Sequence, residues 1–99
     1  MLLHFDLEDQ GFDWDEANVT HLARHKVDPI EAEEAILDAN AIMLEIQAED
    51  EERFKSVGRT LGGRILAVVF TFRGELIRPI TSFDAPVREQ RAYLKGHLE

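Results

Sequence analysis

The sequence predicts an α+β domain: a small antiparallel sheet of three to four strands, with two N-terminal helices and one C-terminal helix. Three observations lead to this fold class. Apolar residues recur at helical spacing up to about residue 38, they alternate or form short runs after residue 42, and glycine-containing turns separate those runs. Helices and strands that are segregated along a chain in this way are typical of α+β domains.

The 99 residues are expected to form one domain over residues 1–99. A chain of this length with 44% hydrophobic content is long enough to bury a modest single core, and it is too short for a second one.

A short strand and a helix are predicted first. Residues 11–14 alternate between apolar and other residues and are interpreted as the first strand. A helix is predicted over residues 15–26, because apolar residues recur there at helical spacing. Asp15 is suited to cap its first turn, and the basic residues at its end favour the last turn through the helix dipole.

The second helix, over residues 28–38, has the strongest start signal in the chain. Asp28 is a capping residue, Pro29 stands at the first helical position, and Glu31 follows three residues after the cap. These three residue types at this spacing are typical of a helix N-terminus.

The second half is predicted to contain four strands and a helix. The strands cover residues 41–46, 53–59, 64–72 and 75–81, and the helix covers residues 86–94. The third of these strands has an unbroken apolar centre, which predicts a central strand covered on both faces. Pro79 lacks an amide donor, so the fourth is expected at a sheet edge or at a bulge.

Charge divides the chain in two. Residues 1–52 contain 16 acidic and 2 basic residues, a formal charge of −14, whereas residues 53–99 contain 4 acidic and 9 basic residues, a charge of +5. The chain therefore contains a basic segment that is able to bind a polyanion, although its total formal charge is −9. The chain has no cysteine, no signal-peptide pattern and no apolar run long enough for a membrane span, so we expect a cytoplasmic protein without membrane contact.

An ordered set of residues carries a resemblance to a known family. It comprises Trp14-Asp15-Glu16, Arg24-His25, Val27, Glu31-Ala32, Glu52-Arg53-Phe54, Gly58-Arg59, Gly63-Arg64-Ile65-Leu66, Val68-Val69-Phe70-Thr71, Arg73-Gly74, Ile77-Arg78, Ile80, Ala85, Glu89 and Tyr93. Over about residues 12–94, this set resembles the BrnT family of toxins. The resemblance implies a RelE-like fold and an endoribonuclease that needs no metal or other cofactor. It also implies a cognate DNA-binding antitoxin as partner, with RNA as substrate and no direct DNA binding without the antitoxin.

The implied chemistry requires cations and groups that transfer protons. Cutting RNA without a metal needs a base for the 2′-hydroxyl, positive charge for the five-coordinate phosphorus and an acid for the 5′-oxygen. Histidine exchanges a proton most readily near neutral pH, arginine holds phosphate through two N–H groups, and an aromatic ring stacks on a base. The candidate catalytic residues are His25, Arg24, Arg78 and Tyr93, and the candidate RNA-binding residues are Arg53, Arg59 and Arg64.

The chain departs from the family pattern at several positions. Phe83 and Asp84 stand where family members usually have an arginine and a second basic residue. Asn18 replaces a frequent lysine, Lys26 replaces a usual glycine, and His21 replaces a frequent asparagine. These changes leave a second interpretation open, in which the chain keeps the BrnT fold as a catalytically degenerate protein-binding module.

The individual residues also have structural interpretations. His21 and His25 are spaced like a zinc-binding pair, but Leu22 occupies the position of a metalloprotease glutamate and no third ligand is apparent. His25 is alternatively a helix-end residue that interacts with the helix dipole. The arginines are alternatively salt-bridge partners for the acidic half, and Tyr93 is alternatively a core residue.

Overall fold

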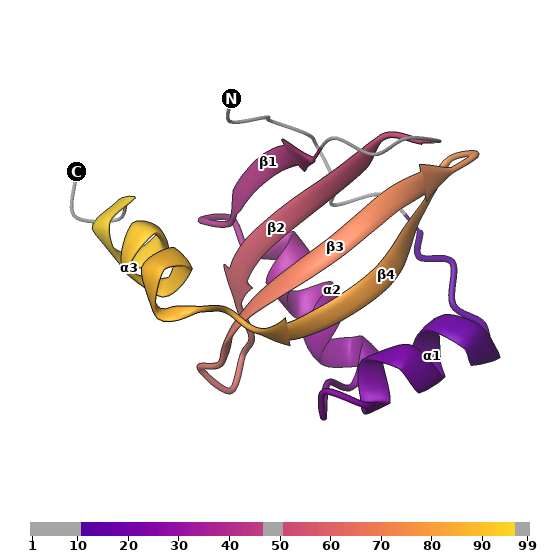
Figure 1. Cartoon of the computed structure of the whole chain (residues 1–99), viewed down its shortest axis with the longest axis horizontal. Coiled ribbons are helices and arrows are strands. Elements are labelled where there is room, and N and C mark those ends of the chain that lie inside the picture. Colours follow the sequence, from indigo (N-terminus) through magenta and orange to yellow (C-terminus); the bar gives the residue numbers. More distant parts are fainter. Residues whose placement is uncertain (1–10, 47–50, 97–99) are drawn as a thin grey trace.

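A computed structural model, which describes residues 11–46 and 51–96, confirms the α+β class (Figure 1). Its elements are α1 (Glu16–Ala23), α2 (Pro29–Leu37), β1 (Ile42–Ile46), β2 (Arg53–Arg59), β3 (Ile65–Arg73), β4 (Leu76–Asp84) and α3 (Val87–Gly96). The four strands form one sheet in the order β1-β2-β3-β4, and each neighbouring pair is antiparallel. None of the described helices has the length and apolar character needed to cross a lipid bilayer.

The predicted helix starts are confirmed. Asp15 accepts a hydrogen bond from the backbone N–H of Asn18 (3.2 Å), and the Asn18 side chain accepts one from the Asp15 N–H (2.8 Å). In the same way, Asp28 accepts from the N–H of Ile30 (2.9 Å), and Glu31 accepts from the N–H of Asp28 (3.1 Å). Both helices therefore begin with capping boxes, which satisfy amide donors that the helix itself leaves unpaired.

The first helix is shorter than predicted and ends at Ala23. Lys26 adopts a φ of 59°, which is left-handed backbone that glycine adopts most easily. The N–H of Val27 bonds to the carbonyl of Leu22 (3.2 Å), and that of Lys26 bonds to the carbonyl of Ala23 (3.0 Å). This is the hydrogen-bond pattern of a Schellman motif, and it closes the helix before the basic residues can extend it.

The first predicted strand is wrong, because it is reduced to a single parallel bridge between Phe12 and Ile77. If the pairing of residues 11–14 with β4 continued beyond this bridge, the next amide donor on β4 would be that of Pro79, which has no N–H. The side-chain amide of Asn18 instead donates to the carbonyl oxygens of Asp13 (2.9 Å) and Pro79 (3.0 Å). An asparagine side chain thus takes the place of the missing backbone ladder.

The last strand ends three residues later than predicted, at Asp84. Phe83 and Asp84 belong to β4 and pair with Ala67 and Leu66 of β3. The sequence does not show this extension because the pairing comes from β3, a separate part of the chain. The prediction for the proline in this strand is confirmed, because β4 lies at the edge of the sheet and its register with β3 shifts between Val69 and Phe70.

Two apolar clusters cover the opposite faces of the sheet. The larger one joins α1 and α2 to one face through Leu22, Val27, Ala32, Ala35, Ile36, Met43, Phe54, Leu66, Val68, Phe70 and Ile77. The smaller one joins α3 to the other face through Val57, Ala67, Ala85 and Tyr93. In Figure 1, α2 lies behind the sheet, α1 runs beside β4, and α3 lies beyond the end of β2. The apolar centre of β3 is therefore buried on both faces, as predicted.

Candidate functional site

Arg78 lies on β4 between two carboxylates. Its guanidinium nitrogen Nη1 is 3.1 Å from Oδ2 of Asp15 and 3.4 Å from Oδ2 of Asp13, and the Arg78 side chain is only 13% exposed. The hydrogen bond to Asp15 raises the pKa of Arg78, and the same bond lowers the pKa of the Asp15 carboxyl. Because Asp15 caps α1, Arg78 connects the start of that helix to the sheet, and its charge is balanced inside the protein.

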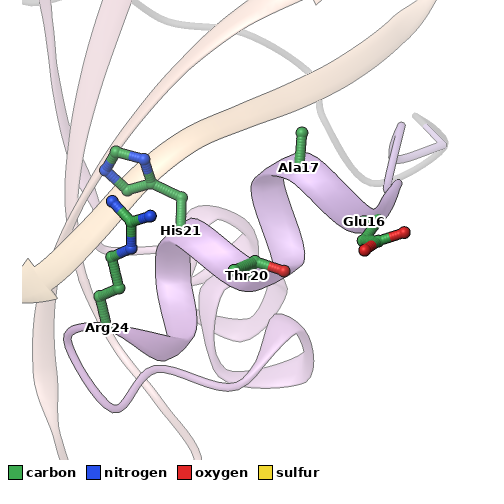
Figure 2. A pocket seen from close by; sticks show the side chains of 5 residues that line it. All are labelled: Glu16, Ala17, Thr20, His21 and Arg24. Carbon is green, nitrogen blue, oxygen red and sulfur yellow. The ribbon is translucent and has the colours of Figure 1, made fainter.

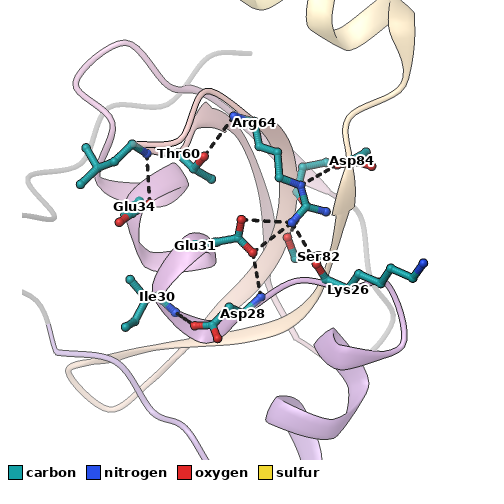
Figure 3. Close-up of polar contacts among 11 residues, drawn as sticks. Lys26, Asp28, Ile30, Glu31, Glu34, Thr60, Arg64, Ser82 and Asp84 are labelled. Atoms are coloured by element: carbon teal, nitrogen blue, oxygen red, sulfur yellow. Dashed lines mark hydrogen bonds and ion pairs between the residues drawn. The ribbon is translucent and has the colours of Figure 1, made fainter.

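Arg64 is held by groups from three separate segments, as Figure 3 shows. Its Nη1 donates to both carboxylate oxygens of Glu31 (3.0 and 3.1 Å) and to the backbone carbonyl of Lys26 (2.9 Å). Its Nε donates to Oδ1 of Asp84 (3.0 Å). Partial burial opposes the charge of Arg64, but the bonds to Glu31 and Asp84 outweigh it and raise the pKa of the guanidinium. Arg64 therefore fastens the loop after α1 and the start of α2 to the end of β4.

Tyr93 packs in the smaller core cluster and is 2% exposed. Its hydroxyl donates to Oδ2 of Asp38 (2.5 Å), which also accepts from the backbone N–H of Arg59 (2.8 Å). Burial and the bond to Asp38 raise the pKa of Tyr93 to about 12. The Arg59 guanidinium lies over the Tyr93 ring, 5.7 Å from its centroid. Tyr93 and Asp38 thus join α3, the end of α2 and the end of β2.

Arg53 lies at the start of β2, where its Nε is 3.3 Å from Oε1 of Glu51. Both side chains are about two-fifths exposed, at 41% and 42%. An ion pair exposed to this extent contributes little to stability, so the Arg53 side chain can leave it for another anion at small cost.

Arg24 and His25 lie at the end of α1, and both are exposed. His21, one turn earlier, has its ring centroid 6.4 Å from that of His25, and the Phe83 ring of β4 lies 6.0 Å from that of His25. His21 and Arg24 also line an open surface pocket of about 460 Å³ with residues Glu16, Ala17 and Thr20. Figure 2 shows the His21 and Arg24 side chains extending from the same side of α1.

The structure brings only some of the candidate residues together. Arg24 and His25 are neighbours, and Arg64 lies close to them because it bonds to the carbonyl of Lys26. Arg78 is bonded at the start of α1, nine residues and about 13 Å along the helix axis from Arg24. Tyr93 lies on α3 with the Arg59 guanidinium over its ring, and Arg53 lies at the opposite end of β2 from Arg59.

Three residues of these sites are not among the predicted site residues. His21 is a departure from the family pattern that has zinc-pair spacing to His25 without a third ligand, and this spacing of four also predicts that the two side chains lie close together. Phe83 replaces a family arginine, and no sequence signal places its ring beside His25. Asp38 was not singled out, because only the tertiary structure brings Tyr93 and Arg59 to it.

No cluster of three or more His, Asp or Glu side chains with the geometry to hold a metal ion occurs within residues 11–46 and 51–96.

Comparison with known proteins identifies one family. A family model described as "Ribonuclease toxin, BrnT, of type II toxin-antitoxin system" matches residues 14–89. No curated protein matches the chain.

Proposed function

This chain belongs to the BrnT family of ribonuclease toxins from type II toxin-antitoxin systems, and from this premise we propose that it is an endoribonuclease that cuts RNA without a metal ion. The observation that carries the proposal is the exposed pair of Arg24 and His25 at the end of α1. Among the described residues, no carboxylate forms an ion pair with the Arg24 guanidinium, in contrast to Arg64 and Arg78. This cation is available to a phosphate.

The proposed reaction uses these two side chains directly. His25 accepts the proton of the 2′-hydroxyl as its oxygen attacks phosphorus, and Arg24 stabilises the additional negative charge on the phosphoryl oxygens. The bond from phosphorus to the 5′-oxygen breaks, and this oxygen takes a proton from an acid beside it. Arg53 and Arg59 remain candidate contacts for the RNA backbone, whereas Arg64, Arg78 and Tyr93 support the site through the fold.

Membership in a type II toxin-antitoxin family implies an antitoxin partner for this chain. We propose that this partner is a DNA-binding protein encoded beside the chain, and that both act in the cytoplasm. The chain alone, with a formal charge of −9, is not expected to bind DNA.

A second function is favoured by the ion pairs of the sheet. Arg64 is balanced by Glu31 and Asp84, and Arg78 is balanced by Asp13 and Asp15. If phosphate binding requires these two arginines, the chain is a catalytically degenerate BrnT-like module that binds only the antitoxin. The two functions differ in one measurable property, which is RNA cleavage.

The test is an RNA cleavage assay with purified protein in EDTA. We expect the wild-type protein to cut single-stranded RNA, and we expect Arg24→Ala to lower the rate at least about 100-fold, the scale of a lost transition-state cation. Arg88→Ala, which removes an exposed arginine of α3, is the matched control and should cut at the wild-type rate. Intact RNA with folded wild-type protein that still binds its antitoxin would establish the second function instead.

A further inference from the structure

We propose that the end of α1 carries a two-histidine cleavage site, in which His21 is a second proton-transfer residue and Phe83 is a stacking platform for a base of the RNA. This inference rests on the proposed endoribonuclease function and assigns roles to two residues outside the family pattern. Both are departures noted in the sequence, and the structure places the ring of each within 6.4 Å of the His25 ring.

The two histidines are placed to act on one phosphate. His21 lies in the last turn of α1 and His25 follows the end of that helix four residues later, a spacing at which side chains lie close together. Their ring centroids are 6.4 Å apart, and both side chains are exposed. A proton-transfer group needs to lie within about 2.6–3.2 Å of the atom it serves, and a phosphodiester lying against both rings meets that condition at two different oxygens. Arg24 lines the same pocket as His21, so a cation lies beside the same space.

Two histidines solve a problem that one histidine leaves open. Cleavage forms a bond from the 2′-oxygen to phosphorus and breaks the bond to the 5′-oxygen, giving a 2′,3′-cyclic phosphate and a 5′-hydroxyl. One histidine, neutral at the start, takes the proton of the 2′-hydroxyl. The other, protonated at the start, gives its proton to the departing 5′-oxygen. Protons and charge balance without a metal or any other reactant, and the reaction is fastest where one ring is neutral and the other is charged.

Phe83 supplies a flat apolar surface next to this pair. Its ring is half-buried at the end of β4 and lies 6.0 Å from the His25 ring, tilted by 59°. The ammonium group of Lys55 lies 5.9 Å from the Phe83 centroid and forms an ion pair with Glu89, so its charge is balanced within the protein. Single-stranded RNA is commonly held by stacking of its splayed bases on aromatic side chains. Where the family resemblance predicts an arginine for phosphate, this chain has a ring suited to a base.

The charged groups around the histidines do not supply another proton-transfer pair. Glu16 and Arg24 line the pocket with His21, Lys26 follows His25 in the chain, and Arg64, which bonds to the Lys26 carbonyl, is paired with Glu31 and Asp84. Asp84 and Arg78 are engaged in ion pairs with Arg64 and with Asp15, respectively. Arginine and lysine stay protonated near neutral pH. A rate profile with two limbs near neutral pH would therefore report the two histidines.

The experiment measures the cleavage of a single-stranded RNA oligonucleotide in EDTA as a function of pH. We expect a bell-shaped profile for the wild-type protein and products that end in a 2′,3′-cyclic phosphate. His21→Asn, which restores the usual family residue, should lower kcat at least about 100-fold and remove one limb of the profile. His21→Gln should do the same. Lys95→Asn, an exposed basic residue of α3, is the control and should leave the rate and the profile unchanged.

The Phe83 platform is tested with two substitutions. Phe83→Leu should raise KM for RNA about tenfold while kcat stays near the wild-type value, because stacking holds the substrate and not the transition state. Phe83→Tyr keeps the ring and should restore the wild-type KM. Thermal unfolding of each variant shows that it is folded.

The outcomes separate this inference from the function on which it rests. If the wild-type protein cuts RNA and His21→Asn keeps both the rate and the bell-shaped profile, His21 has no catalytic role and the two-histidine site is refuted, while the proposed function stands. A Phe83→Leu variant with unchanged KM refutes the platform. If the folded wild-type protein leaves RNA intact, the proposed function fails, and the two-histidine site fails with it.

Discussion

Replacing Gly58 by alanine should separate α2 from the sheet. Gly58 lies on β2 directly beneath α2, and a Cβ atom at this position would lie 2.0 Å from the backbone oxygen of Ala35. Real Cβ atoms keep at least 3.0 Å from such an atom, so the helix and the strand must move apart by about 1 Å. The obstacle is helix backbone, which cannot rotate away as a side chain can.

The size of the effect follows from the packing of α2. A gap of about 0.5–1 Å removes a quarter to a half of each van der Waals contact. Ile36 is 1% exposed, and a buried side chain of this size makes about 40 contacts of about 0.1 kcal/mol each, so Ile36 alone loses about 1–2 kcal/mol. Ala32 and Ala35 are fully buried in the same interface and add to the loss. We expect the free energy of unfolding to fall by about 2–3 kcal/mol, out of a total of about 5–15 kcal/mol for a domain of this size.

Urea unfolding followed by tryptophan fluorescence measures this change. Trp14 is the only tryptophan, and it packs against the larger core cluster with its Nε1 bonded to Glu33 (2.7 Å). Gly62→Ala is the matched control, because its Cβ would meet only the Thr60 hydroxyl at 3.8 Å. That variant should be unchanged or more stable by up to about 1 kcal/mol. A Gly58→Ala variant within about 0.5 kcal/mol of the wild type would refute the close approach of α2 to β2.

Three further predictions concern stability. Lys26→Gly should raise the free energy of unfolding by about 0.5–1 kcal/mol in the same urea assay. Glycine adopts the left-handed backbone of this position without steric strain, and the energy of the relieved strain exceeds the entropy cost of glycine. Lys26→Ala should show no such gain. The raised pKa of Tyr93, about 12, means that the neutral hydroxyl stabilises the fold below pH 10 and that this stability is lost as pH rises from 10 to 12. Tyr93→Phe should remove this alkaline decline in thermal unfolding, and a decline parallel to the wild type would contradict the bond to Asp38. Arg78 lowers the pKa of the Asp15 carboxyl, so the ionised Asp15 stabilises the fold above about pH 4 and this stability is lost as pH falls further. Asp15→Asn should therefore flatten the acid limb of the stability profile. An unchanged acid limb would contradict the pairing of Asp15 with Arg78.

The local elements were predictable where a short segment carries its own signals. Asp28, Pro29 and Glu31 form a complete start signal, and the helix begins there. The strand predicted over residues 53–59 has these same bounds in the structure, because its alternation is a local property. The first strand and the end of β4 were mispredicted, because both depend on partners elsewhere: the missing N–H of Pro79 limits the first, and pairing with Leu66 extends the second.

The candidate site was predictable in residue type and less so in arrangement. The sequence singled out Arg24 and His25, and the structure places them together on an exposed helix end. It also suggested salt bridges as an alternative for the arginines, which the structure confirms for Arg64 and Arg78. That Phe83 lies beside His25 was not predictable, because β4 meets the end of α1 only in the folded protein.

The sequence by itself determined the α+β class, the caps of α1 and α2, the family, and the set of basic residues that a ribonuclease could use. These follow from short-range periodicity and capping, or from an ordered pattern of residues that a family shares. Only the tertiary structure decided which cations are available to a ligand. Arg64 and Arg78 find carboxylates that are 20 or more residues away in the chain, whereas Arg24 does not find one among the described residues. The sequence shows which residues are arginines, but neutralisation of an arginine depends on its distance from a carboxylate in space, and folding sets that distance.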